Sequence, residues 1–126
     1  MEIINIESTP KTPSVTFDAV QGILVIKGRS IPENSVEFYR PMMEWLDKYS
    51  AQPTKKTNVN IQLEYFNTSS SKCILDIFKK LEAMHKKGNE IVINWFYEED
   101  DEDMQEAGED YQAIIQIPFK MERILE

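Results

Sequence analysis

The stretch NVNIQLEYFNTSSSKCILDIFKKLEAMHKKG, residues 58–88, changes its hydrophobic period part-way and so decides the fold. Apolar residues first occupy every second position: Val59, Ile61, Leu63 and Tyr65. This alternation predicts a strand with one buried and one polar face. Apolar residues then recur three or four positions apart: Ile74, Ile77, Phe78, Leu81 and Met84. That spacing predicts an amphipathic helix, with Gly88 placed to end it.

The turn between them, residues 67–72, is rich in hydroxyl groups. Any of these hydroxyls could be the helix N-cap, because a side-chain oxygen there accepts a hydrogen bond from a free N–H of the first turn. The same N–H groups and the positive end of the helix dipole also suit a phosphate, and Lys72 adds a cation. The residues alone leave both a plain helix cap and a phosphorylation site open.

The residues before this stretch predict an opening hairpin and a helix. Residues 2–7, 14–17 and 23–26 have strand patterns, and residues 18–22 suit a hairpin connection. Asn34, three residues before Glu37, predicts the N-cap of the next helix. The apolar stripe of that helix is Val36, Tyr39, Met42 or Met43, Leu46 and Tyr49, with Trp45 beside it. Pro41 predicts a kink or a broken first turn, and Trp45 is expected to pack partly on the core unless it is a binding anchor.

The residues after Gly88 predict a strand at 90–97, a helix around 104–114 and a last edge strand over 115–121, which contains Pro118. The acidic run 98–110 follows the strand and overlaps the start of this helix. We expect it to be a solvated segment or the N-terminus of the helix, and a cation site or a surface for a basic partner are the alternatives. The whole order predicts an α/β (α+β) fold in one domain, 1–126. A single mixed sheet of about five to six strands would carry helices mainly on one face, because the polar face of residues 58–64 is hard to bury.

Composition narrows the classes of function. The 126 residues carry a formal net charge of −8, which argues against nucleic acid as a partner. No apolar run approaches the roughly 20 residues that cross a bilayer, and the N-terminus lacks a signal peptide, so we expect a cytoplasmic protein with no membrane contact. The chain has one cysteine, Cys73, and one histidine, His85, and both fit structural roles better than a metal or catalytic site. No cofactor is expected.

Three blocks of the sequence resemble SiaC-type regulatory phosphoproteins, small bacterial proteins similar in architecture to anti-sigma-factor antagonists of the STAS type. The first block is Tyr65-Phe66-Asn67-Thr68-Ser69-Ser70, followed by Lys72, Asp76 and Ile77. The second is Pro32-Glu33-Asn34-Ser35 with Phe38, Tyr39, Pro41, Trp45 and Tyr49. The third is Val92, Asn94, Trp95 and Tyr97 before the charged run. The blocks follow the family's order over nearly the whole chain.

The resemblance implies a non-enzymatic switch protein with Thr68 as the phosphorylation site. In that family a dedicated protein kinase phosphorylates this threonine, a dedicated phosphatase reverses it, and the unmodified form binds and activates a diguanylate cyclase. Asn67, Ser69, Ser70 and Lys72 would then surround the site and contact the partner. Two alternatives stay open: a constitutive interaction module whose turn only caps a helix, and an enzyme or metal-binding protein built on the acidic run.

Overall fold

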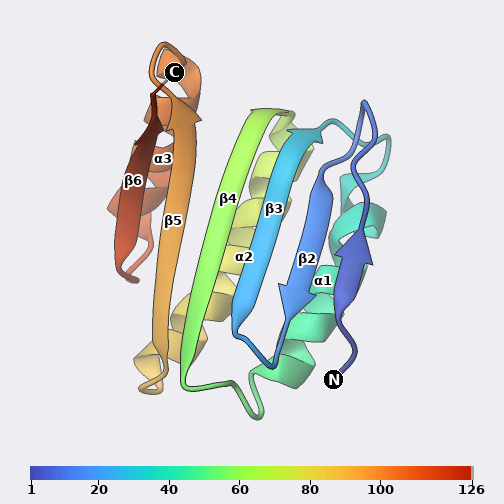
Figure 1. The fold of residues 1–126 in the computed structure, drawn as a ribbon, viewed down its shortest axis with the longest axis vertical. Helices are drawn as coiled ribbons and strands as arrows, with labels where there is room; N and C mark the ends of the chain where they lie inside the picture. The colour runs from blue at the N-terminus through green and yellow to red at the C-terminus, as the bar shows by residue number, and fades with distance from the viewer. Residues whose placement is uncertain (126) are drawn as a thin grey trace.

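A computed structural model describes residues 1–125, and Glu126, part of the predicted domain, lies outside the described residues. The elements, in chain order, are β1 (Ile4–Ile6), β2 (Ser14–Asp18), β3 (Ile23–Ser30), α1 (Ser35–Tyr49), β4 (Lys56–Phe66), α2 (Thr68–Lys86), β5 (Glu90–Glu98), α3 (Glu102–Ile114) and β6 (Phe119–Ile124). The strands form one six-stranded sheet in sequence order (Figure 1). β1, β2 and β3 pair antiparallel, whereas β3 to β6 pair in parallel. The predicted mixed sheet is therefore confirmed.

All three helices lie on the same face of the sheet (Figure 1). The core fills the space between this face and the helices, with Ile61, Ile93 and Trp95 fully buried on the sheet side. On the opposite face polar side chains pair with one another, as where the Asn94 amide donates to Asn60 Oδ1 at 2.9 Å. The prediction that helices cover mainly one side is confirmed, because a face carrying amides keeps its hydrogen bonds without a second helix layer.

A β-bulge in β4 places one residue that was predicted to be buried on the exposed face of the sheet. Gly28 pairs with Leu63 but Arg29 pairs with Tyr65, so Glu64 is an extra residue in β4. Since one extra residue moves the following side chains to the other face, Tyr65 is 54% exposed and Phe66 turns toward the core. Tyr65 was predicted to be buried, and that prediction is wrong.

Helix α1 begins as predicted and continues through its proline. The Asn34 side chain accepts from the Glu37 N–H at 3.1 Å, which confirms the cap. No break occurs at Pro41, and the helix runs on to Tyr49. Trp45 is only 6% exposed, so it packs on the core and is not an exposed anchor, whereas Val36 is 61% exposed and does not belong to the buried stripe.

The C-terminal segment differs from prediction in its boundary. Residues 115–118 form a connection, and β6 begins at Phe119, after Pro118. The Pro118 carbonyl accepts from the Ile93 N–H at 2.9 Å, but proline has no N–H to continue the ladder. The predicted helix over 104–114 and the edge position of the last strand are confirmed. Of the helices described in residues 1–125, none has both the length and the apolar character needed to cross a membrane.

Candidate functional site: the Asn67–Lys72 turn and its hydroxyl network

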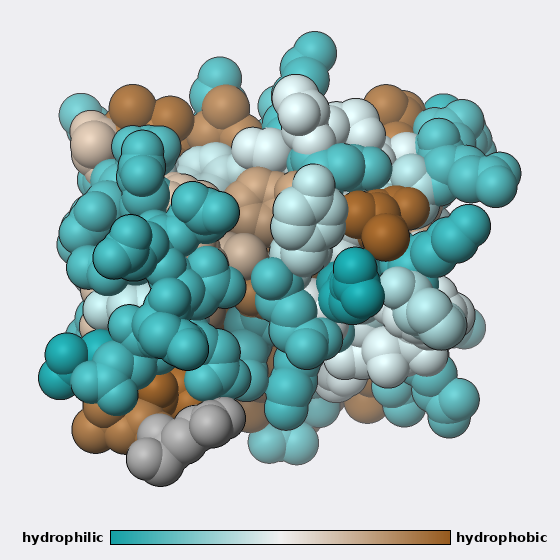
Figure 2. Space-filling model, turned by 90° about the horizontal axis from the view of Figure 1, so that it is seen from above, coloured by the Kyte–Doolittle hydropathy of each residue, from teal (hydrophilic) through white to brown (hydrophobic). Residues whose placement is uncertain are grey.

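The N-termini of α1 and α2 lie close together at one end of the sheet. Because β3 and β4 are parallel, the C-terminal ends of both strands lie at this end, and α1 and α2 begin just after them. The Asn67 N–H donates to the Ser30 carbonyl at 3.0 Å and so ties the end of β4 to the end of β3. Figure 2 views the molecule from this end and shows mostly hydrophilic residues with apolar ones exposed between them. The turn at residues 67–72 lies here.

The N-cap of α2 is Asn67. Its side-chain oxygen accepts from the Ser70 N–H at 2.9 Å, and its backbone is extended, as an N-cap requires. The prediction that a hydroxyl of the turn would be the cap is wrong. An asparagine amide oxygen caps a helix as well as a serine does, and Asn67 is the residue that directly precedes the first helical one.

A buried network of hydroxyl groups joins the two helix starts. Ser70 is fully buried, and its Oγ lies 2.8 Å from Ser30 Oγ and 3.2 Å from Ser35 Oγ. Ser30 Oγ is also 2.7 Å from the Tyr39 hydroxyl on α1. Burial raises the pKa of Tyr39 to about 12, so this hydroxyl keeps its proton at neutral pH. The network therefore fixes α1 and α2 against the end of β3.

The neighbouring serines also have partners. Ser69 Oγ lies 2.7 Å from Ser35 Oγ and donates to Asn67 Oδ1 at 3.2 Å. Ser71 Oγ lies 2.9 Å from the hydroxyl of Tyr111 on α3, and this hydroxyl donates to the Ser71 carbonyl at 2.8 Å. Burial raises the pKa of Tyr111 as well. The three serines of the turn thus hold neighbouring elements in place.

Thr68 differs from these serines. It is the first residue of α2 and is exposed, and among residues 1–125 its hydroxyl takes part in no hydrogen bond. Lys72 lies four residues later, on the same side of the helix, and is also exposed with no salt bridge to any described residue. A free hydroxyl, a helix N-terminus and a nearby ammonium group therefore occur together at the surface.

The structure brings most of the predicted site residues together at the surface. Asn67, Thr68, Ser69 and Lys72 are partly or fully exposed, whereas Ser70 is fully buried, so its hydroxyl cannot touch a partner in this conformation. The sequence-based prediction also missed the side chains that support the turn from elsewhere in the chain: Ser30, Ser35, Tyr39 and Tyr111. Only the register of β3 against β4 brings them here, and no local pattern signals it.

The acidic run serves as the start of a helix. Asp101 is the N-cap of α3, and its carboxylate accepts from the Met104 N–H at 3.0 Å. Glu102 and Asp103 occupy the first turn, where negative charge complements the helix dipole. Within residues 1–125, no cluster of three or more His, Cys, Asp or Glu side chains is arranged to hold a metal ion.

Comparison with known proteins agrees with this architecture. The family model described as "SiaC family regulatory phosphoprotein" matches residues 6–124. The chain belongs to the SiaC family. An uncharacterized protein of Pseudomonas aeruginosa strain UCBPP-PA14 is 30% identical over 122 residues, which are 97% of each chain. The similarity to anti-sigma-factor antagonists stays a prediction.

Solved structures of SiaC from Pseudomonas aeruginosa have the same fold as this chain. Apo-SiaC is 30% identical and superposes with a TM-score of 0.89, covering 97% of this chain and 99% of that one. A second structure contains the diguanylate cyclase SiaD in complex with its activator SiaC. It matches at 30% identity with a TM-score of 0.91, covering 96% of this chain and 99% of the other.

Proposed function

We propose that this SiaC-family protein is a non-enzymatic switch whose partner choice depends on phosphorylation of Thr68. A dedicated protein kinase adds the phosphate and a phosphatase removes it. The unmodified protein binds and activates a diguanylate cyclase. The proposal of this effector draws on the solved complex in which SiaC of Pseudomonas aeruginosa is the activator of the cyclase SiaD.

The observation that carries the proposal is the state of the Thr68 hydroxyl. Ser69, Ser70 and Ser71 use their hydroxyls to hold α1, β3 and α3, so modifying any of them breaks contacts that maintain the fold. Thr68 is exposed, and its hydroxyl makes no hydrogen bond to any of residues 1–125. A kinase can therefore reach it, and a phosphate can be added without first opening the turn.

Phosphorylation at this position changes the surface and leaves the core intact. A phosphate adds about −1.5 to −2 charges at neutral pH. The first N–H groups of α2 and the positive end of its dipole favour this charge, and Lys72 one turn later is within reach of it on the same side of the helix. A partner that docks beside Thr68 meets a changed charge and a bulkier side chain, while the helix keeps its cap on Asn67.

The first test is phosphopeptide mapping by mass spectrometry of the protein isolated from its own cells in several growth conditions. We expect phosphate on Thr68 in some conditions and not in others, with the neighbouring serines unmodified. Full coverage of residues 67–72 with no phosphate in any condition would leave the turn with a structural role alone and would favour a constitutive interaction module.

A binding comparison separates the switch from the constitutive module. If the protein is a switch, Thr68→Ala binds the cyclase like the wild type and no longer responds to the kinase, whereas Thr68→Glu binds more weakly. In a constitutive module both variants bind like the wild type and treatment with the kinase changes nothing. Glutamate carries less charge than phosphate, so the kinase-treated wild-type protein is the decisive sample.

A further inference from the structure

Strand β6 forms one free edge of the sheet (Figure 1). In its parallel pairing with β5, the Pro118 carbonyl accepts from the Ile93 N–H at 2.9 Å, and the Ile124 carbonyl accepts from the Glu99 N–H at 3.2 Å. Successive residues of a strand direct their backbone groups to opposite sides, so the even-numbered residues here face β5 and the odd-numbered ones face away. The residues whose backbone groups point outward are Phe119, Met121 and Arg123. A further strand can pair with them.

The two charged side chains on the open face of β6 have opposite signs. Lys120 pairs with Asn94 and Glu122 with Phe96, so both project from the face of the sheet that carries no helix. Neither forms an ion pair with any of residues 1–125. Met121 lies between them. A second β6 strand that runs antiparallel, with the two Met121 residues opposite one another, therefore places Lys120 of each copy opposite Glu122 of the other.

Only this register places Lys120 opposite Glu122. In an antiparallel pair of β6 strands, residues whose backbone groups point outward must lie opposite one another, so the pair is centred on a single residue. Centring it on Lys120 places this lysine opposite its own copy, and centring it on Glu122 does the same for the glutamate. Like charges directly opposite one another are destabilising. Charged residues on an edge strand usually prevent pairing, but here they favour one partner, a second copy in one register.

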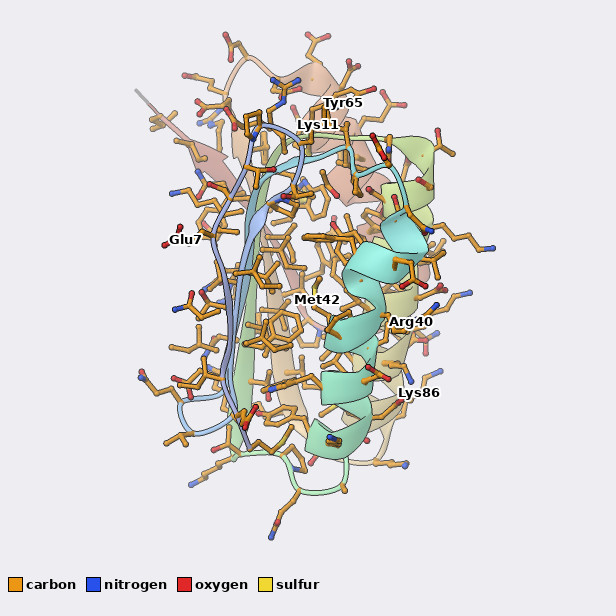
Figure 3. All side chains as sticks on the ribbon, turned by 90° about the vertical axis from the view of Figure 1, so that its right-hand side faces the viewer. Glu7, Lys11, Arg40, Met42, Tyr65 and Lys86 are labelled. Carbon is orange, nitrogen blue, oxygen red and sulfur yellow. The ribbon has the colours of Figure 1, made fainter. Side chains whose placement is uncertain are left out.

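The other edge of the sheet, β1, has no such match. This strand has only three residues, and the acidic Glu2 and Glu7 flank it, with no lysine or arginine in residues 1–10. Figure 3 views the molecule from this edge and shows the helix layer on one side of the sheet and Glu7 pointing away from it. Two β1 strands would bring acidic residues together, so we assign self-association to β6.

Helix α3 packs against β5 and β6, so its charges bear on the pairing. The Gln112 amide donates to the Phe119 carbonyl at 2.9 Å, which shows that this side of α3 faces the edge. Two exposed acids, Glu109 and Glu102, lie toward the same side. In the register described, Arg123 of each copy lies opposite Phe119 of the other and next to that side of its α3. Arg123 is exposed and forms no ion pair with any of residues 1–125, so it can offset part of this acidic charge.

We propose that two copies of this chain associate through β6 into a symmetric dimer, in which the two six-stranded sheets join into one. The two-fold axis passes between the two Met121 residues, perpendicular to the sheet, so both helix layers lie on the same side and the contact is closed. The Asn67–Lys72 turn follows β4, which β5 separates from β6, so the turn stays exposed in both copies. The dimer goes beyond the proposed function and does not depend on it, because none of its contacts involves Thr68.

The test is sedimentation equilibrium of the purified chain over a range of concentrations. We expect the mass of the wild type to rise from 14.7 kDa toward twice that value, and to rise less at high salt, which screens the exposed ion pairs. Lys120→Glu and Glu122→Lys each turn two attractive pairs into two repulsive ones, so each should raise the dissociation constant of the dimer about tenfold or more. Lys27→Glu is the matched control, because Lys27 is exposed on the same face but lies on β3, away from the edge. It should associate like the wild type.

Mixing the two edge variants tests the register itself. In an equal mixture, Lys120→Glu of one copy meets the unchanged Glu122→Lys partner with opposite charges at both positions, so association should return. The same result shows that both variants are folded. A wild type that stays at 14.7 kDa up to about 1 mM would overturn the proposal, as would a dimer that neither edge variant weakens or a mixture that does not associate. A mass that rises beyond that of a dimer would also overturn it, because pairing of β6 with β1 forms open chains.

Discussion

Removing single hydroxyls from the turn should separate its structural residues from its exposed one. Ser70 Oγ is fully buried and lies within hydrogen-bond distance of three oxygens: Ser30 Oγ at 2.8 Å, the Ser30 carbonyl at 3.1 Å and Ser35 Oγ at 3.2 Å. Each of these oxygens keeps another partner, so Ser70→Ala should lower the free energy of unfolding by about 1–2 kcal/mol. For a domain of this size, that corresponds to a fall in Tm of about 4–8 °C. Thr68→Ala removes a hydroxyl with no partner among the described residues and should change the free energy of unfolding by less than about 0.5 kcal/mol.

The assay is urea unfolding followed by circular dichroism, with both variants and the wild type measured side by side. Equal slopes against urea would show that the three proteins expose the same surface on unfolding. Two results would refute the reasoning. A loss above about 1 kcal/mol in Thr68→Ala would mean that this hydroxyl supports the fold. An unchanged Ser70→Ala would mean that the buried network contributes nothing to stability.

Three further predictions concern the supports of the site. Asn67→Ala should lower the free energy of unfolding by about 1 kcal/mol in the same urea assay, because the N-cap of α2 is lost; a stability equal to wild type would contradict the assigned cap. Burial raises the pKa of Tyr39 from 10.0 to about 12, so the folded state holds this proton more tightly. The stabilisation is complete below about pH 10 and is lost as pH rises to about 12, a loss of about 2–3 kcal/mol. Over the same pH range Tyr39→Phe should lose less stability by about that amount, and the loss that remains includes the contribution of Tyr111, whose pKa burial also raises. Gly108→Ala should destabilise the protein by about 1–2 kcal/mol, although alanine favours helices, because its Cβ would lie 2.4 Å from the ring of the fully buried Trp95. A more stable variant in thermal unfolding would show that α3 can move away from β5.

Much of the fold was predictable because local patterns carry it. Alternation along β4 and helical spacing along α2 are properties of adjacent residues. The N-cap Asn34 and the glycine that follows the end of α2, Gly88, are predicted from the same short windows. The exposure of Tyr65 was not predictable in this way, since the bulge at Glu64 arises from pairing between β3 and β4.

The position of the site could be predicted from the sequence, but which of its hydroxyls are buried and hydrogen-bonded and which is exposed could not. The sequence places four hydroxyls in one turn, but it does not say which of them have partners. Ser70 meets Ser30, which lies 40 residues earlier, and Ser71 meets Tyr111, which lies 40 residues later. These contacts come from the sheet order and the packing of α3, and within the part of the chain that the structure describes they leave the Thr68 hydroxyl without a hydrogen-bond partner.

The most direct test of the central claim is a calorimetric titration of the cyclase with two preparations of this chain, one unmodified and one carrying phosphothreonine at position 68. The account predicts that the unmodified chain binds and that the phosphorylated chain binds at least about tenfold more weakly, while both give the same circular dichroism spectrum and similar stability. Equal affinities of the two preparations would contradict it.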